Sequence, residues 1–518
     1  MNALAVLYGG SLTEAAYEQV FSGKSALALA LERVAAFPDT RKILLLITQT
    51  TPIRQLDGVQ GIELIRSVEW TKKQVLDTIA RESAGFDLTY FAWVDCPFLD
   101  PELAKAIAER HLRYVAEYSY TDGWPYGLSP EILAPGMGGI LSKITGDADG
   151  PVERDMLFSV IQKDINAFDI ETILSPVDLR CHRLSLTADS KRNLLLLTRF
   201  AEAGFSRAQD AQTLIAEKPE LLRTLPNFFS IQVAGPCLQS CTLCPYPRFH
   251  GSGDLTQRTD FLEEDCFEDI LARIITFAGD GVIDLSLWGE LSLHPKKMEL
   301  IQMVLSRPEL SLIIESSGLG WKIDELEQAA AEAQKALPRR NSMAPLSWIL
   351  ALDTQDPARY REIRGLGYAE ALASAKTLTR LFPRDAYVQA VRVKGFEDDI
   401  EQFYRSWKEA GAPIIIQKYD HFCGSLPALG ATDLSPVKRQ PCWHLLRDMV
   451  ILLDGTVPCC REDLGALTGG SEKRIGGNVF SDPLETIWAR GAALYQEQCM
   501  SAYTGICAGC DEYYTYNF

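Results

Sequence analysis

The 518-residue sequence has no apolar run long enough to cross a membrane. A transmembrane helix needs roughly 18 or more consecutive apolar residues. Runs such as "ILLLI" and "NLLLL" are only the size of a strand or a short helix. The amino terminus, "MNALAVLYGG", also lacks the basic segment of a signal peptide. We therefore expect a cytoplasmic protein with no membrane partner.

Positive charge is scarce as well. The 51 lysines and arginines face 69 acidic residues, which leaves a net charge of −18. This balance argues against sequence-independent binding to nucleic acid or to anionic lipid. A hydrophobic fraction of 47% and a charged fraction of 23% are typical of a globular protein. The length predicts about three domains.

Disulfides are not expected in a reducing compartment, so the 13 cysteines need another explanation. An odd, clustered set indicates metal binding. Five cysteines are scattered and are predicted to be small buried hydrophobes, namely Cys96, Cys181, Cys266, Cys423 and Cys499. The other eight form two clusters: Cys237, Cys241 and Cys244, and then Cys442, Cys459, Cys460, Cys507 and Cys510.

Hydrophobic periodicity predicts an α/β protein with four segments. In residues 1–186 the strands "LAVLYGG" and "KILLLIT" flank the amphipathic helix "KSALALALERVAAF", a plan typical of a parallel-sheet domain. Residues 187–226 are predicted to be a helical connector. Residues 227–430 contain six strands separated by helical patterns ("FFSIQV", "IDLSLW", "LSLIIES", "SWILALD", "AYVQAVRV", "PIIIQKY"), which indicates a parallel barrel or partial barrel. Residues 431–518 are cysteine-rich, with a predicted hairpin in "DMVILLDGTVPCC" around its Asp-Gly turn.

Cys237, Cys241 and Cys244 follow the first strand of the second alternation, where a parallel barrel places its active site. A structural zinc site takes four ligands. Three thiolates can instead hold three irons of a four-iron cluster and leave one iron open to an outside ligand. Half of a zinc site is the alternative.

The next strands end in "LWGELSLHP", "IESSG" and "LALDTQDPARYREIRG", and with the cysteine loop these segments closely resemble the radical S-adenosylmethionine (radical SAM) superfamily. The resemblance implies a [4Fe-4S] cluster on the three cysteines, whose open iron binds the methionine part of SAM. Arg364 is our candidate for the SAM carboxylate, because a guanidinium matches the geometry of a carboxylate. Leu243 replaces an aromatic residue that is frequent in the superfamily, which leaves Tyr246 as a candidate for stacking the adenine. The other implied SAM contacts are Trp288, Gly289 and Glu290 for the amino group, and Ser316, Ser317, Asp353 and Gln389 at later strand ends.

At the carboxy end, Cys442 is followed by 12 residues, Gly455, four residues and Cys460, and Cys507 and Cys510 form a C-x2-C pair. This pattern resembles the SPASM domain, an auxiliary-cluster module of radical SAM enzymes that modify peptides or proteins. The resemblance implies one auxiliary [4Fe-4S] cluster in a truncated, twitch-like version, held by Cys442, Cys460, Cys507 and Cys510. Neighbouring residues on a strand point to opposite faces, so Cys459 is not expected to be a ligand together with Cys460. A zinc site on the same four cysteines is the alternative.

The endings "CDEYYTYNF" and "GNVFSDPLETIW", with "RQPCWHLLRDMVILLDGTVPCCRED", resemble the spiro-SPASM proteins, which add an amino-terminal nucleotidyltransferase-like domain. In the first segment, "YFAWVDCPFLDPELAKAI" resembles the nucleotidyltransferase and glycosyltransferase-A fold, in which Asp95 matches a residue that helps to hold a divalent metal. The amino-terminal loop offers only Gly9, Gly10 and Lys24 for phosphate and carries glutamates besides. We therefore expect substrate binding or docking from this domain.

The resemblance implies a radical SAM enzyme that reductively cleaves SAM to a 5′-deoxyadenosyl radical and modifies a peptide, a protein or a small molecule. An electron donor such as flavodoxin or ferredoxin would serve it, and no residue is assigned to the reaction with substrate. One alternative is a nucleotide-sugar transferase-like enzyme with a cluster-bearing regulatory tail. Another is a zinc-stabilised binding protein without catalysis.

Overall fold

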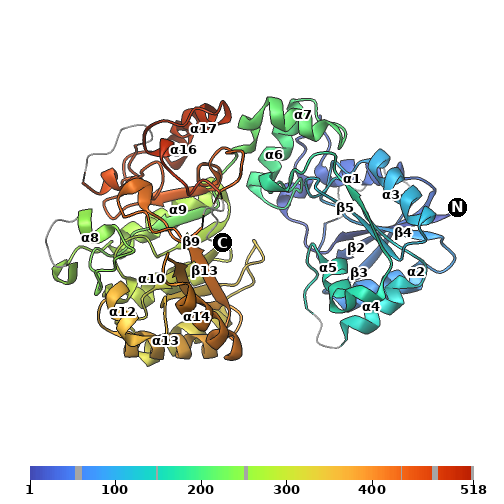
Figure 1. Cartoon of the computed structure of the whole chain (residues 1–518). Helices are drawn as coiled ribbons and strands as arrows, with labels where there is room; N and C mark the ends of the chain where they lie inside the picture. The colour runs from blue at the N-terminus through green and yellow to red at the C-terminus, as the bar shows by residue number, and fades with distance from the viewer. Residues whose placement is uncertain (53–60, 147–149, 250–254, 433–434, 469–475, 515–518) are drawn as a thin grey trace. The chain divides into compact units, whose positions relative to one another are not determined.

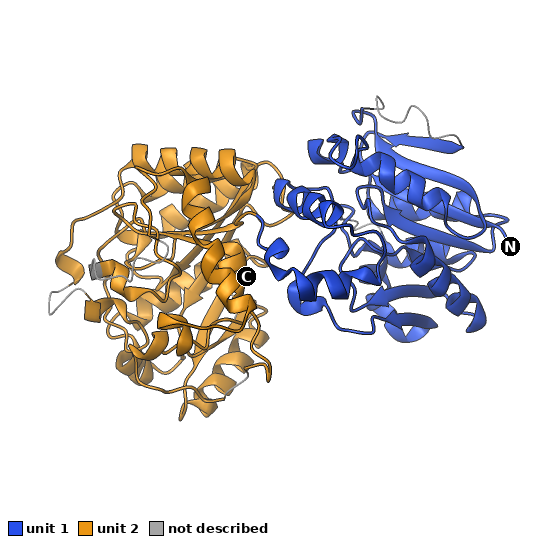
Figure 2. Ribbon diagram, turned by 90° about the horizontal axis from the view of Figure 1, so that it is seen from above, with its two compact units in different colours: residues 1–224 blue, residues 225–518 orange. Residues whose placement is uncertain are grey.

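The structure, a computed structural model, describes residues 1–518 except 53–60, 147–149, 250–254, 433–434, 469–475 and 515–518. The chain divides into two compact units, Met1–Thr224 and Leu225–Phe518 (Figure 2). None of the described helices combines the length and the apolar character that a membrane span requires.

The first unit is built on a seven-stranded sheet with the order β3-β2-β1-β4-β6-β5-β7 (Figure 1). Its neighbouring strands pair in parallel except at β6, which is antiparallel to β4 and β5. The predicted strands "LAVLYGG" and "KILLLIT" form β1 and β2, with α1 between them, which confirms a parallel α/β organisation. The strands are β1 (Ala3–Gly9), β2 (Thr40–Thr48), β3 (Ile62–Ser67), β4 (Leu88–Trp93), β5 (Tyr118–Asp122), β6 (Glu131–Leu133) and β7 (Ile170–Leu174), and the helices are α1 (Ala26–Ala35), α2 (Lys72–Glu82), α3 (Pro101–Arg113), α4 (Met137–Thr145) and α5 (Met156–Ile161).

The expected connector packs onto this first unit. It forms α6 (Lys191–Glu202) and α7 (Asp210–Glu217). The ring of Phe205 contacts that of Phe98 at 5.0 Å between centroids, and the backbone N–H of Ala208 donates to Asp100 at 2.6 Å. The compact unit that includes this connector ends at Thr224, two residues before the predicted end of the connector.

The second unit is a parallel seven-stranded sheet with the order β13-β12-β11-β10-β9-β8-β14. All six strands predicted for residues 227–430 are present, and they lie in the sheet in sequence order with helices between them (Figure 1). The strands are β8 (Phe228–Ile231), β9 (Gly281–Asp284), β10 (Leu310–Ser316), β11 (Leu346–Ala351), β12 (Ala386–Arg392), β13 (Ile414–Lys418) and β14 (Asp448–Ile451). The helices are α8 (Tyr246–Phe249), α9 (Glu264–Ala278), α10 (Lys297–Leu305), α11 (Ile323–Lys335), α12 (Pro357–Ile363), α13 (Tyr368–Leu381), α14 (Glu397–Glu409), α15 (Trp443–Arg447), α16 (Leu484–Arg490) and α17 (Ala492–Cys499).

The two faces of this sheet bury different side chains. One set of alternate residues, including Phe229, Leu312 and Trp348, packs with the helices in the main core. The intervening set forms a separate apolar cluster of Phe228, Val282, Ile313 and Ile349. Because side chains alternate along a strand, the second set lies on the other face of the sheet.

The predicted carboxy-terminal hairpin is reduced to its turn. Gly455 has a positive φ of 83°, and the N–H of Leu452 donates to the carbonyl of Thr456 at 2.8 Å. The preceding strand, β14, pairs in parallel with β8 from Asp448 opposite Phe228 onwards. This apolar strand buries more surface beside β8 than an isolated two-stranded hairpin would.

The described residues of the predicted carboxy-terminal domain, 431–518, belong to the same compact unit as the six-stranded segment. Seven buried side chains of the carboxy-terminal segment join the main core, namely Met449, Ile451, Val457, Val479, Leu484, Ile487 and Trp488.

Candidate functional site

A cavity of about 250 Å³ opens in the second unit, lined largely by residues from strand ends and the loops that follow them. Such a volume approaches the range of small-molecule sites, roughly 300–1,000 Å³. Of the twelve residues predicted for the cluster and SAM, eleven line this cavity and Asp353 does not. The eleven are Cys237, Cys241, Cys244, Tyr246, Trp288, Gly289, Glu290, Ser316, Ser317, Arg364 and Gln389.

The three-cysteine loop follows β8 and is held by two hydrogen bonds to α12. The N–H of Thr242 donates to the carbonyl of Ile363 at 2.8 Å, and the side-chain amide of Gln239 donates to the hydroxyl of Tyr360 at 2.8 Å. Tyr360 is fully buried, so it serves packing and support of the loop. These bonds fix the loop against α12 without using its thiols.

All three thiols of the loop are free, and burial raises the pKa of each. The pKa of Cys237 rises to about 12, chiefly through burial and then through the negative charge of Glu290. Three converging thiols without a disulfide fit the donor set of an iron–sulfur cluster, whose binding displaces their protons.

The segment Trp288-Gly289 leaves β9 through two residues with positive φ, 44° and 78°. A Cβ at Gly289 would lie 2.0 Å from the carbonyl oxygen of Ala234, so glycine is required there both by conformation and by space. The ring of Trp288 stacks on Tyr246 with centroids 5.9 Å apart and an angle of 8° between the planes. Tyr246 is buried and already stacked, which weakens it as a platform for adenine.

Replacing Gly289 by alanine is expected to destabilise the second unit by about 2–5 kcal/mol, because it adds left-handed strain to a backbone clash. Gly411, which also has a positive φ (73°) but open space around its Cβ position, is the matched control. Its alanine variant should lose only about 1–2 kcal/mol. Denaturant unfolding measures both variants, and equal losses would show that the close approach at Gly289 is not tight.

Glu290 ties the ends of β9 and β10 together. Its buried carboxylate accepts from the hydroxyl of Ser316 at 2.8 Å, and from the hydroxyl and N–H of Ser317 at 2.7 and 3.0 Å. Burial raises the pKa of Glu290, and the hydrogen bonds from the serines oppose that shift. The backbone N–H of Ser292 is a fourth donor, so the bonds already made equal the roughly four lone-pair positions of a carboxylate. A ligand ammonium group would therefore replace or share one of these donors.

Arg364 does not present a free guanidinium to the cavity. Its Nε pairs with Asp353 at 2.5 Å, and its Nη1 lies 3.9 Å from the sulfur of Cys241. Asp353 has a positive φ of 64° and also accepts from the N–H of Val391 at 2.8 Å. Asp353 thus positions Arg364 beside the cysteine loop, and the terminal nitrogens of Arg364 are the part that a ligand carboxylate can reach.

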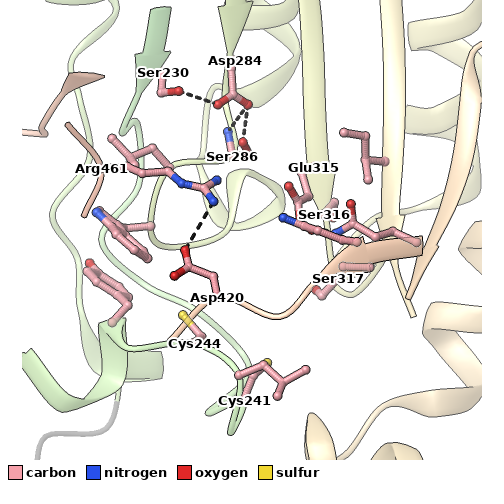
Figure 3. Close-up of a pocket in the computed structure, with 18 of the residues that line it drawn as sticks. Ser230, Cys241, Cys244, Asp284, Ser286, Glu315, Ser316, Ser317, Asp420 and Arg461 are labelled. Atoms are coloured by element: carbon pink, nitrogen blue, oxygen red, sulfur yellow. Dashed lines mark hydrogen bonds and ion pairs between the residues drawn. The ribbon is translucent and has the colours of Figure 1, made fainter. Parts of the chain in front are cut away.

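Sequence reasoning missed a second polar group in this cavity, formed by Asp284, Glu315, Asp420 and Arg461 (Figure 3). Arg461 pairs with Asp420 at 3.5 Å and with Glu462 at 3.1 Å. The sequence does contain a feature that could have indicated this group. An acidic residue, Asp284 or Glu315, stands inside each of the apolar strand segments "IDLSLW" and "LSLIIES".

The carboxy-terminal cysteines line a second, small cavity, together with one residue that the sequence did not assign to it. Cys423 lies in a short 3₁₀ turn (Phe422–Gly424) after β13 and is hydrogen-bonded to Cys510. Six thiols line this cavity: Cys423, Cys442, Cys459, Cys460, Cys507 and Cys510.

The alternation argument that separated Cys459 from Cys460 does not apply, because neither residue lies in a strand. Their sulfurs are 3.9 Å apart and line the same cavity. All six thiols are free, so the donor set fits a thiolate-bound metal centre.

In the first unit, Asp95 follows β4 but is occupied. Its two carboxylate oxygens accept from Nη1 and Nη2 of Arg154 at 2.8 and 2.6 Å, and Arg154 also pairs with Asp189 at 2.9 Å. Lys24, the candidate phosphate ligand, pairs with Glu32 at 2.6 Å. This arrangement does not leave Asp95 open to a divalent metal.

The comparisons with known proteins show a family relationship but do not show an activity. No family model matches the chain. The chain belongs to the same family as an uncharacterized protein of Treponema pallidum (strain Nichols), with 34% identity over 371 residues, 70% of this chain and 98% of that protein. A second uncharacterized protein of the same organism is 43% identical over 54 residues, 10% of this chain and 25% of its own length.

Solved structures show only distant likeness. Streptococcus suis SuiB bound to the precursor peptide SuiA has a TM-score of 0.41 and 13% identity, covering 64% of this chain and 76% of SuiB. A cytidylyltransferase from Leptospira borgpetersenii has a TM-score of 0.36 and 17% identity, covering 42% of this chain and 95% of its own. Similarities at this level support no conclusion about function.

Proposed function

We propose that the protein is a radical SAM enzyme of the spiro-SPASM type, which cleaves SAM reductively and modifies a peptide, a protein or a small molecule. One observation carries the proposal. The three free thiols of one loop share a cavity with the polar ends of β9 and β10 and the guanidinium of Arg364. Parallel α/β folds place their active sites at this carboxyl end of the strands.

Cys237, Cys241 and Cys244 would hold the [4Fe-4S] cluster through three irons. When bound and reduced, the cluster would supply one electron to SAM, whose sulfur–C5′ bond breaks to give methionine and the 5′-deoxyadenosyl radical. The carboxylate of Glu290, fixed by Ser316 and Ser317, is proposed to accept from the methionine ammonium group.

The terminal nitrogens of Arg364 are proposed to bind the methionine carboxylate, while Asp353 fixes the arginine in place. Trp288, Gly289 and Gln389 complete the SAM contacts in the proposal. The parallel sheet of β8 to β13, which we propose forms a partial barrel, would keep water from the reacting groups.

At the carboxy end we propose one auxiliary [4Fe-4S] cluster held by Cys442, Cys460, Cys507 and Cys510. The convergence of these thiols on one cavity supports this assignment. An external donor such as flavodoxin or ferredoxin is proposed to deliver the electron.

The test of the proposal is spectroscopic. Anaerobically reconstituted protein, reduced with dithionite, should give the electron paramagnetic resonance signal of a reduced four-iron cluster, and SAM should shift that signal by binding to the open iron. If iron and acid-labile sulfide are absent and zinc is bound instead, the protein is a zinc-stabilised binding protein and the proposal is wrong.

A transferase with a cluster-bearing tail is the second candidate, and the nucleotidyltransferase-like pattern around Asp95 is what favours it. The pairing of Asp95 with Arg154 argues against a metal-dependent transfer site. We therefore assign the first unit to substrate binding or docking within this proposal.

Replacing Asp95 by asparagine should leave SAM cleavage unchanged within about twofold, because Asp95 belongs to the other compact unit. It should destabilise the first unit by about 1–3 kcal/mol, since Arg154 loses a charged hydrogen-bond partner. Deoxyadenosine formation and thermal unfolding measure the two effects. A hundredfold loss of cleavage in folded protein would contradict the assignment of this unit to a separate role.

A further inference from the structure

The cavity of the second unit has an apolar part and a polar part. Along a strand, the residue that lines the polar part comes two positions after the residue of the apolar part. Its apolar part is lined by Phe228, Ile313 and Ile349, which form one apolar cluster with Val282. Two positions further toward the carboxyl end, Ser230, Asp284 and Glu315 line the cavity. Residues two apart lie on the same face of a strand, so this acidic pair points into the interior as the apolar cluster does.

In the part of the chain that the structure describes, the groups that donate hydrogen bonds to Asp284 and Glu315 are neutral. Asp284 accepts from the hydroxyl of Ser230 at 2.7 Å, from the N–H of Ser286 at 3.2 Å and from the hydroxyl of Ser286. Glu315 accepts from the side-chain amide of Gln389 at 2.9 Å. Within the described ranges of the chain, no lysine or arginine nitrogen lies within 4.0 Å of either carboxylate.

The basic residues of the cavity are committed to other acids. Arg364 pairs with Asp353, Arg447 with Asp448, and Lys418 with Asp511 and Glu512. Arg461 is the cation whose field reaches both Asp284 and Glu315, but its guanidinium pairs with Asp420 and Glu462.

Two acidic side chains, Asp284 and Glu315, thus face the same cavity, and no described lysine or arginine forms an ion pair with either of them. Burial raises the pKa of both, and the charge of Asp284 raises that of Glu315 further. Such a pair is stabilised when a cation joins it.

A metal ion is a poor candidate for that cation. Among the described residues, neither Asp284 nor Glu315 belongs to a group of three or more acidic, histidine or cysteine side chains whose ligand atoms all lie within 4.8 Å of one another. The methionine ammonium of SAM is already assigned to Glu290. In Figure 3, Asp284 lies away from Cys241 and Cys244, with Arg461 and Asp420 between them in the view.

We propose that Asp284 and Glu315 bind a positively charged nitrogen of the substrate, a primary ammonium or a guanidinium group. This inference rests on the proposed function and names the substrate class of the same cavity. It predicts that the molecule modified by the radical carries an amine or guanidine close to the carbon that loses its hydrogen.

The experiment uses n-butylammonium as the probe and n-butanol as its neutral counterpart, on full-length, anaerobically reconstituted protein with saturating SAM. Ligand-observed NMR titration gives both dissociation constants. Butylammonium should bind at least about tenfold more tightly, the size of one hydrogen bond to a charged group. Asp284→Asn and Glu315→Gln should each remove about that factor and leave SAM affinity within twofold.

Asp265→Asn, on the exposed amino-terminal turn of α9, is the control for net charge and should change nothing. Equal affinity for butanol and butylammonium, or equal binding by the Glu315→Gln variant, would overturn the inference. In a parallel titration without SAM, clearly tighter binding of butylammonium than in its presence would assign the pair to SAM instead and would also overturn it.

The failure of the proposed function gives a different result. In that case the protein neither loads iron nor binds SAM, whereas the ammonium titration can still be carried out on the unloaded chain. Retained SAM cleavage with no ammonium preference would refute the substrate class alone.

Discussion

Replacing Cys237, Cys241 or Cys244 by alanine should reduce the formation of 5′-deoxyadenosine from SAM to background. Each thiol is proposed to hold one iron of the cluster. When one of these three ligands is lost, the cluster is no longer held in the loop, and SAM has no open iron to bind. The measurement is chromatographic detection of 5′-deoxyadenosine after anaerobic incubation with SAM and dithionite.

The variants should remain folded, because the hydrogen bonds that fix the loop come from Thr242 and Gln239 and not from the thiols. Cys181→Ala, which changes an exposed cysteine of the first unit, is the matched control and should keep full activity. Residual SAM cleavage in all three loop variants would contradict the assignment of the cluster to this loop.

Removing Cys507 and Cys510 together should halve the iron content of the reconstituted protein, from about eight irons to about four per chain, given four irons in each cluster. SAM binding to the first cluster should remain. The double variant should also be less stable, because metal ligation at this site ties the end of the chain to the rest of the unit and contributes to the folding free energy.

Cys423→Ser is the matched control for this prediction, because Cys423 lines the same cavity but lies outside the proposed ligand set. It should retain about eight irons. Loss of four irons from this variant would show that Cys423 is a ligand, and four irons with one zinc in the wild type would show that the site is structural zinc. Twelve irons would indicate a further cluster, with Cys459 and Cys499 as the first candidates for its ligands.

Strand positions were predictable because they depend on local patterns. Apolar runs such as "LAVLYGG" and "LSLIIES" mark β1 and β10, which are buried in a parallel sheet on both faces. The spacing of the first three cysteines likewise predicted residues that share one loop and one cavity.

Pairings between distant segments were not predictable from such patterns. The contact between Arg364 and Cys241 joins residues 123 positions apart, and Cys423 reaches Cys510 only because β13 ends beside the last turns of the chain. β14 carries the local signature of a hairpin, but tertiary packing gave it a better partner in β8. The hydrogen-bonded ion pair of Asp95 and Arg154 was missed for the same reason, because the sequence around residue 95 does not indicate a partner 59 positions away.

The most direct test of the account is the incubation of anaerobically reconstituted wild-type protein with SAM and a strong reductant, with no other substrate added. The account predicts 5′-deoxyadenosine and methionine in equal amounts, formed only when reductant and cluster are both present. A protein that is fully loaded with iron and binds SAM, yet forms no 5′-deoxyadenosine above the level of the Cys237→Ala variant, would contradict it.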